Sequence, residues 1–255
     1  MSTPKNFDVN YTINPWMSVQ NKPNTNLARE QWNNLLQILK SWDVKVEVIN
    51  GVVYPDFVFV ADAGIIYNNS FILSNFKFPE RKREIKYWKE YFEKEYEIVD
   101  VSEYGNFEGS GDSFIVKNSF VCGYGFRTSK KAAYKISEIL DLKPIILELI
   151  DNNFFHLDTC FSVLNEDTIL FYPNAFSKKS KEKIENNFNC LAIPQSEALK
   201  FGCNIVSYKN KLILQQGCNK ITSIVEKLGF KAYFINLSEF IKAGGGAKCL
   251  TLKSN

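Results

Sequence analysis

Histidine and arginine are scarce in this chain of 255 residues. His156 is its one histidine, and only Arg29, Arg81, Arg83 and Arg127 supply arginine among 31 basic residues. The six cysteines form no C-x-x-C pair, and with a single histidine this argues against a Cys/His zinc site. Because lysine carries nearly all the positive charge, each arginine is a candidate for bidentate binding of an anion.

Long apolar runs are also missing. Runs such as residues 145–147 (IIL) are far too short to cross a bilayer, and the polar start MSTPKNFDVNYT lacks the apolar core of a secretory signal. The net charge is +3, with 31 basic against 28 acidic residues, and no basic run alternates with aromatic residues. We therefore expect a cytoplasmic protein with reduced cysteines and with neither a membrane nor a nucleic-acid partner.

One arrangement of elements recurs four times: two strands, a helix and a third strand. The predicted units are strands 57–62, 70–74 and 96–101 with helix 80–95; strands 112–116, 119–124 and 144–149 with helix 128–140; strands 158–164, 168–172 and 190–194 with helix 177–188; and strands 203–208, 211–215 and 231–235 with helix 219–228. No linker divides the chain, so residues 1–255 are predicted to form one domain.

The two ends of the chain supply the parts of a fifth unit. These parts are strand 9–13, helix 26–42, strand 44–49 and the C-terminal residues 249–252. A repeat whose last unit is split between the termini favours a closed ring, which leaves no exposed strand edge. The alternative is an ordinary α/β sheet with several hairpins.

Unusual polar residues occur near the start of successive units. Asp62, Glu108, His156 and Cys249 follow one another at intervals of 46, 48 and 93 residues, and half of the last interval falls at FGCN, near Cys203. Equivalent positions of a closed ring converge on its axis, so we expect these side chains to share a central pocket. Each has a structural alternative as a turn or packing residue, but turns do not explain the common spacing.

Two of these positions have further support from their neighbours. Three glycines precede Cys249, and they allow a tight backbone bend with amides aimed at a bound group. His156 and Asp158 are two residues apart on a predicted strand, so both should point to one face. The remaining cysteines in apolar or helix-edge settings are expected to be packing residues: Cys122, Cys160, Cys190 and Cys218.

At these residues the chain resembles the guanidine-modifying superfamily of arginine deiminases, dimethylargininases, arginine dihydrolases and amidinotransferases. The stretches that carry the resemblance are NPWM (14–17), PDFVFVADAG (55–64), FEGSGD (107–112), GYGFRTS (123–129), FHLDTCFSVL (155–164) and GGGAKCLTL (244–252). The resemblance implies an α/β fold of the pentein type, a five-bladed ββαβ propeller whose last blade joins both termini. The most similar branch is that of the small arginine dihydrolases and deiminases.

The resemblance also assigns roles to the central residues. Cys249 would be the nucleophile that attacks the guanidinium carbon, and His156 the general acid and then base. Asp62 and Asp158 would hold the guanidinium nitrogens, while Glu108 would orient His156 or contact the substrate. A planar, resonance-stabilised cation needs carboxylates to hold it and a strong nucleophile such as a thiolate to add to its carbon. No cofactor and no metal is implied.

An amino-acid substrate needs further contacts. Arg127 and Arg81 match positions that bind the α-carboxylate in the dihydrolase-like branch, and Asn14 is a further substrate contact. The alternative for Arg81 is a solvated residue at the start of a helix. The expected partner is a small guanidino compound; homo-oligomers are common, but no interface is readable from the sequence.

The product depends on Asp62. Dihydrolase-like relatives, which convert arginine to ornithine, have Asn at this position, so Asp62 favours a single hydrolysis to citrulline and ammonia. The alternatives are a dimethylargininase, an arginine dihydrolase that yields ornithine and, less favoured at this chain length, an amidinotransferase. The same ring also serves as a non-enzymatic ribosome anti-association factor, but that function predicts loss of the polar set that is present here.

Overall fold

The structure is a computed structural model that describes residues 1–254, and these residues form four sheets of three strands each. In every sheet the first two strands make an antiparallel hairpin and the third pairs in parallel with the second. The strands are β1 (Gly64–Tyr67), β2 (Ser70–Leu73), β3 (Glu97–Asp100), β4 (Ser113–Val116), β5 (Ser119–Tyr124), β6 (Lys143–Glu148), β7 (Phe161–Val163), β8 (Thr168–Phe171), β9 (Asn189–Ala192), β10 (Val206–Tyr208), β11 (Lys211–Gln215) and β12 (Lys231–Ile235).

Helices link the second and third strands of each sheet, because a parallel pair requires a crossover. The crossover helices are α2 (Pro79–Lys82) with α3 (Ile85–Phe92), α5 (Lys130–Ile139), α6 (Lys178–Asn187) and α8 (Asn219–Lys227). Two-residue loops at Lys117-Asn118 and Lys209-Asn210 join the strands of two hairpins, and Lys117 and Lys209 both have positive φ, as such loops require.

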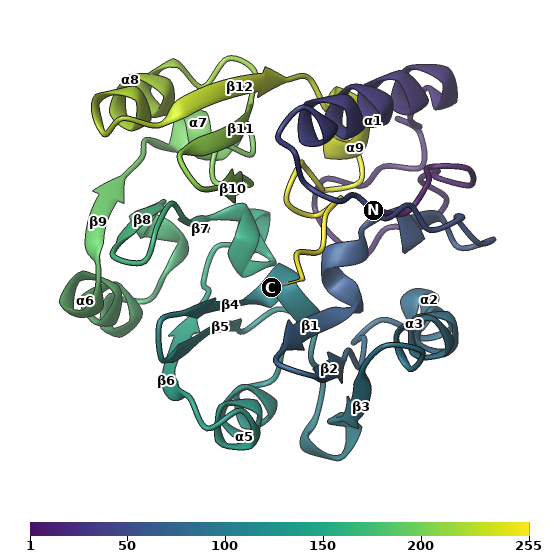
Figure 1. The fold of residues 1–255 in the computed structure, drawn as a ribbon, viewed down its shortest axis with the longest axis horizontal. Coiled ribbons are helices and arrows are strands. Elements are labelled where there is room, and N and C mark those ends of the chain that lie inside the picture. Colours follow the sequence, from purple (N-terminus) through teal and green to yellow (C-terminus); the bar gives the residue numbers. More distant parts are fainter. Residues whose placement is uncertain (255) are drawn as a thin grey trace.

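Figure 1 shows the four units arranged around a common centre, with the N-terminal helix α1 (Thr25–Lys40) and the C-terminal segment in the remaining sector. Asn24 caps α1 by accepting hydrogen bonds from two backbone amides of the first turn. The helix buries an apolar face that includes Trp32 and Leu35 against the core. The short helices α4 (Gly109–Asp112), α7 (Gln195–Ala198) and α9 (Ser238–Ile241) complete the set.

The predicted fifth sheet is not present in the described part of the chain, so the five-bladed propeller is not confirmed. Residues 9–13, 44–49 and 249–252 do not form strands there; a single parallel bridge joins Ser2 to Ile49. The amides of residues 250 and 251 bond to carbonyls four and three residues earlier. These are turn contacts, which leave that segment outside a ladder.

At the centre of the molecule the predicted strand 57–62 is wrong, and the predicted strand 158–164 is confirmed only where β7 lies. Residues 57–62 form 3₁₀ turns, η1 (Pro55–Val58) and η2 (Val60–Ala63), and the strand begins only at residue 64. Residues 157–159 form another 3₁₀ turn before β7. Both stretches are buried at every position, a setting in which period alone does not separate strand from helix. Their turns place polar side chains near the centre.

The predicted helix 80–95 is divided into α2 and α3 at residues 83–84, where the side chain of Glu84 turns inward to bond Arg81. Within residues 1–254, no helix combines the length and the apolar character needed to cross a membrane.

Candidate active site

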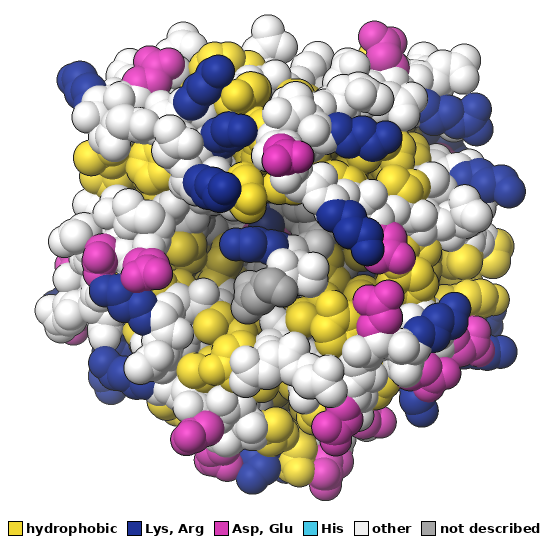
Figure 2. All heavy atoms as spheres, viewed as in Figure 1, with side chains coloured by type: hydrophobic (Ala, Val, Ile, Leu, Met, Phe, Trp, Pro, Cys, Tyr) yellow, Lys and Arg dark blue, Asp and Glu magenta, His cyan; other side chains and the backbone are white. Residues whose placement is uncertain are grey.

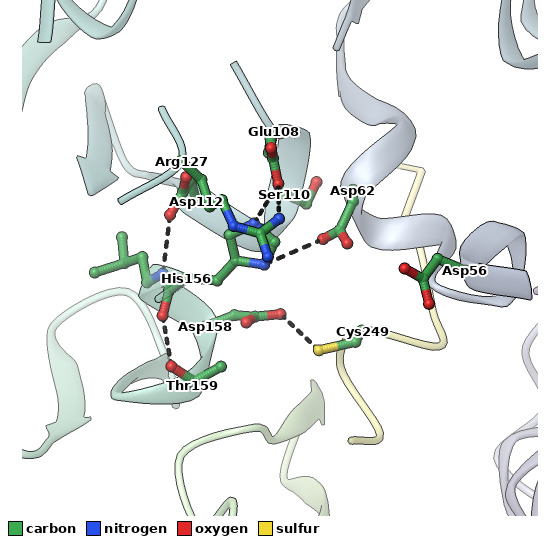
Figure 3. A network of polar contacts seen from close by, with 12 residues as sticks. Asp56, Asp62, Glu108, Ser110, Asp112, Arg127, His156, Asp158, Thr159 and Cys249 are labelled. Atoms are coloured by element: carbon green, nitrogen blue, oxygen red, sulfur yellow. Dashed lines mark hydrogen bonds and ion pairs between the residues drawn. The ribbon is translucent and has the colours of Figure 1, made fainter. Parts of the chain in front are cut away.

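The polar residues predicted to converge do lie together near the centre of the molecule (Figure 3). A small cavity there has a volume of about 20 Å³, roughly the space of one water molecule. Asp62, His156, Arg81, Arg127 and Cys249 are among its lining residues. This space is too small for a ligand larger than a water molecule unless the residues that line it move.

Cys249 is buried beside Asp158 and Asn204. Its thiol donates to Oδ2 of Asp158 at 3.3 Å, and Nδ2 of Asn204 donates to Sγ at 3.1 Å. Burial, followed by the negative charges of Asp158 and Asp62, raises the pKa of the thiol well above its ordinary value. Burial also raises the pKa of Asp158 to about 7, although Lys248 and His156 oppose the shift. Without a cation between these groups, Cys249 is a neutral thiol at neutral pH.

Asn204 fixes the nucleophile loop as a whole. Its Oδ1 accepts from the backbone amides of Lys248 and Cys249 at 2.8 and 3.3 Å, and its Nδ2 also reaches the carbonyl oxygen of Asp158 at 3.1 Å. The preceding glycines permit close packing: a Cβ on Gly245 would lie 2.2 Å from the ring of Phe59. A larger residue there would push the loop away from its position.

His156 lies between two carboxylates. Its Nε2 is 2.8 Å from Oε2 of Glu108, and its Nδ1 is 3.7 Å from Oδ1 of Asp62. Burial alone would lower the pKa of His156, but Asp62, Asp112 and Glu108 outweigh it and raise the pKa to about 9. The ring is therefore an imidazolium at neutral pH, with Nδ1 directed toward Asp62 and Nε2 held by Glu108 (Figure 3).

Glu108 connects this histidine to Arg127. The guanidinium of Arg127 donates to Oε2 of Glu108 at 2.8 Å and to the carbonyl oxygen of Ile13 at 2.9 Å. It also lies between the rings of Phe78 and Phe155, each 4.7 Å away. Burial alone would raise the pKa of Glu108, but Arg127 and His156 hold it well below its ordinary value. Glu108 is thus a permanent anion.

Arg81 is buried in the site, so the solvated alternative is wrong. Its Nη1 donates to Oδ2 of Asp62 at 2.5 Å, and its Nε and Nη2 bond the two carboxylate oxygens of Glu84 at 2.9 and 3.0 Å. Asp62 also faces Gly111, where a Cβ would lie 2.3 Å from Oδ1. Only glycine at this position leaves the oxygen accessible to the cavity.

Asn14 supports the segment over the cavity. Its side chain donates to the carbonyl oxygen of Ala243 at 3.0 Å and accepts from the amide of Trp16 at 2.9 Å. Asn14 thus ties the N-terminal loop to the glycine-rich loop that precedes Cys249. The structure brings together every side chain in the predicted set.

Three buried residues were missing from that set. Asp112 accepts from the amides of Thr128 and Leu157, each at 3.1 Å, and so holds the residues beside Arg127 and His156. Asn204 is the neighbour of Cys203, to which the spacing pointed. Asp56 lines the cavity, and its proximity to Asp62 in PDFVFVAD was the available signal.

The other cysteines lie outside the cavity lining. Cys122, Cys160 and Cys203 are fully buried, and burial raises the pKa of each thiol well above its ordinary value. All six cysteines of the described residues are free thiols. Among the described residues there is also no group of three or more His, Cys, Asp or Glu side chains suited to hold a metal ion.

The residue before Cys249 lines a second, larger cavity. Lys248 borders a cavity of about 570 Å³, and its Nζ donates to the carbonyl oxygen of Ser110 at 3.2 Å. Figure 2 shows a hollow near the centre of one face, with Lys and Arg side chains around it.

A family model for eukaryotic N,N-dimethylarginine dimethylhydrolases matches residues 3–254. The chain belongs to this family. Among its relatives is the bifunctional arginine dihydrolase/ornithine cyclodeaminase AgrE of Nostoc sp., which is 36% identical over 99% of this chain and 37% of its own length. The dimethylarginine dimethylaminohydrolase of Mycobacterium tuberculosis is 34% identical over 99% of this chain and 84% of its own.

Solved structures of similar proteins share the fold. The N-terminal domain of ArgZ, an arginine dihydrolase of cyanobacteria bound to its product, superposes with a TM-score of 0.95 at 34% identity and covers 99% of this chain and 95% of that one. A variant of the same domain is covalently bonded to a reaction intermediate. The chain spans just over a third of the length of its bifunctional cyanobacterial relatives.

Proposed function

We propose that this family member hydrolyses a C–N bond of arginine or of a closely related guanidino compound. One observation carries the proposal: Oδ1 of Asp56, of Asp62 and of Asp158 is buried and has no hydrogen-bond partner among the described residues. Unpaired carboxylate oxygens are costly to bury, so the site is suited to a ligand with several cationic donors. Arginine has two such groups, a guanidinium and an α-ammonium.

The positions of these oxygens suggest how arginine binds. Asp62 and Asp158 flank Cys249 and would each accept from a guanidinium nitrogen. Asp56, further along the cavity and held by the hydroxyl of Tyr11 at 2.9 Å, would accept from the α-ammonium. The α-carboxylate would bind near Arg127 and Arg81, with Asn14 holding the loop above it.

The first half of the reaction uses Cys249 and His156. A guanidinium between the two aspartates brings positive charge beside Cys249, which lowers the pKa of the thiol and favours the thiolate. Sγ then attacks the guanidinium carbon, and the C–N bond to the leaving nitrogen breaks as that nitrogen takes a proton from Nδ1 of His156. Ammonia, or an alkylamine from a methylated substrate, departs and leaves a thiouronium on Cys249.

The second half reverses the proton transfer. Neutral His156 removes a proton from a water molecule, and the resulting hydroxide adds to the thiouronium carbon. The C–S bond then breaks as the added hydroxyl loses its proton to solvent, which releases a ureido product and the thiolate. Glu108 favours return of the proton to His156 because its charge stabilises the imidazolium. The residues present therefore supply nucleophile, acid and base.

The product remains citrulline in this proposal, although the relatives do not confirm that expectation. Asp62 offers no hydrogen-bond donor to the ureido oxygen of citrulline, which disfavours a second hydrolysis. The names of the two cyanobacterial relatives instead favour the alternative, a dihydrolase that yields ornithine. Dimethylarginine is a second candidate substrate, because the mycobacterial relative matches over most of its own length.

Product analysis tests the proposal. The purified chain is incubated separately with arginine, asymmetric dimethylarginine and agmatine, and the products are identified by mass spectrometry. We expect citrulline and ammonia from arginine, and no turnover by Cys249→Ser. Absence of turnover with every guanidino compound would contradict the proposed activity.

A further inference from the structure

Arg81 places a guanidinium of the protein on the carboxylate that the proposed substrate requires. Its Nη1 donates to Asp62 at 2.5 Å, and both side chains are buried. We propose that Arg81 makes the site selective for guanidino compounds that carry a carboxylate: it occupies Asp62 until the carboxylate of the substrate draws it away. This inference rests on the proposed function and adds a specificity mechanism to it.

The contacts of Arg81 permit such an exchange. Glu84 holds one edge of the guanidinium through two hydrogen bonds, and Nη2 also donates to the carbonyl oxygen of Asp56 at 3.2 Å. The ring of Phe76 lies 4.3 Å from the guanidinium carbon. These contacts anchor the group, so only Nη1 has to exchange Asp62 for a substrate carboxylate.

Arg127 is the second arginine of the proposed carboxylate subsite. It lines the same cavity as Arg81, but its own acid partner is Glu108, which does not bind the substrate guanidinium in this proposal. A carboxylate that enters the cavity is attracted by both arginines. When Nη1 of Arg81 turns to the carboxylate, Oδ2 of Asp62 becomes free in addition to the unpaired Oδ1.

A substrate without a carboxylate meets a different site. Its guanidinium would share Asp62 with Arg81, and two cations would compete for one buried anion. Agmatine is arginine without its carboxylate. Arg81 should weaken the binding of agmatine by more than the loss of its contact with a carboxylate, because it also competes for Asp62. This additional loss of affinity distinguishes a gate, which blocks Asp62, from a residue that only binds the carboxylate.

Binding to an inactive protein tests the gate. Calorimetry compares arginine and agmatine on Cys249→Ser, with and without Arg81→Met, and Arg83→Met is the matched control because Arg83 is exposed on the same segment. We expect Arg81→Met to weaken arginine binding but to strengthen agmatine binding by about tenfold, the value of one charge-assisted hydrogen bond. If Arg81→Met leaves the affinity for agmatine unchanged, Arg81 only binds the substrate carboxylate. If it weakens that affinity, Arg81 positions other residues of the site. Either result overturns the gate.

A second measurement needs no substitution at Arg81, whose loss leaves Glu84 buried without its partner. Formate has the carboxylate that agmatine lacks, so it should strengthen agmatine binding to Cys249→Ser about tenfold. Potassium chloride at equal ionic strength is the control, and an unchanged affinity in formate overturns the gate. Failure of the unmodified chain to bind or hydrolyse arginine would instead overturn the proposed function.

Discussion

Replacement of Glu108 by glutamine should lower the pKa of His156. In the intact site the pKa of this histidine is about 9, against about 6.5 for an unperturbed histidine. Three carboxylates maintain the shift against burial, and Glu108 is the one in direct hydrogen-bond contact, at 2.8 Å. A charge-assisted hydrogen bond is worth about 1.5–3 kcal/mol, or about 1–2 pKa units, so Glu108→Gln should bring the pKa of His156 to about 7–8.

The single histidine makes this measurement unambiguous. An NMR titration of the labelled imidazole reports His156 alone, and catalysis offers a second readout. His156 must be protonated to release the leaving amine, so activity should decline above about pH 9 in the unmodified chain and above about pH 7–8 in Glu108→Gln. A midpoint near 9 in the variant, or near 6.5 in the unmodified chain, would refute the reasoning.

The sign of the effect on stability follows from the same shift. Because the pKa of His156 is higher in the folded chain than in the unfolded chain, the bound proton stabilises the folded state. This stabilisation is complete below about pH 6.5 and is lost as the pH rises through about 9. The shift of about 2.5 units corresponds to about 3 kcal/mol, and Glu108→Gln should remove about half of it. Urea unfolding at pH 6 and pH 9 measures the difference.

Three further substitutions test the remaining assignments. Cys249→Ser should reduce turnover at least about 10³-fold while leaving the urea midpoint and arginine binding intact; near-normal turnover would exclude Cys249 as the nucleophile. Asp62→Asn supplies the missing donor and should raise the ornithine fraction of the product in amino-acid analysis; ornithine as the main product of the unmodified chain would remove the basis of this prediction. Asn204→Asp keeps the acceptor for the loop amides but places a negative charge beside Sγ of Cys249. Turnover and the rate of Cys249 alkylation at pH 8 should therefore both fall about tenfold or more. An unchanged alkylation rate would contradict the hydrogen bond from Asn204 to Sγ.

The strands of the four sheets were predictable because each hairpin consists of β-forming residues and a short turn. The hairpin at Lys117-Asn118, for example, combines β-forming residues with a loop that adopts positive φ. The central segments were not predictable in this way. Residues 57–61 are apolar and, like Asp62 after them, fully buried, so their conformation depends on the elements that surround them rather than on their own period.

His156 and Asp158 both lie in the central site, but they do not alternate along a strand as expected (Figure 3). Asp158 lies in a 3₁₀ turn that precedes β7, and His156 is the N-cap of that turn. Asp112 holds that turn by accepting from the amide of Leu157, and Thr159 closes it with a hydrogen bond from its hydroxyl to the carbonyl oxygen of His156 at 2.6 Å. These tertiary contacts leave no periodic signal in the sequence.

The repeat spacing also locates Asn204, a site residue that the sequence prediction did not name. Asp62, Glu108, His156, Asn204 and Cys249 follow one another at intervals of 46, 48, 48 and 45 residues. The spacing predicts a residue of the site within FGCN. The asparagine of this stretch lies in the site, whereas the prediction named its cysteine because cysteine is a nucleophile. An amide suits this position because it both accepts and donates: it accepts from the backbone amides of the nucleophile loop and donates to Sγ. A second thiol or carboxylate at the same place would compete with Cys249 or repel its thiolate, so the repeat required a neutral polar residue at this position.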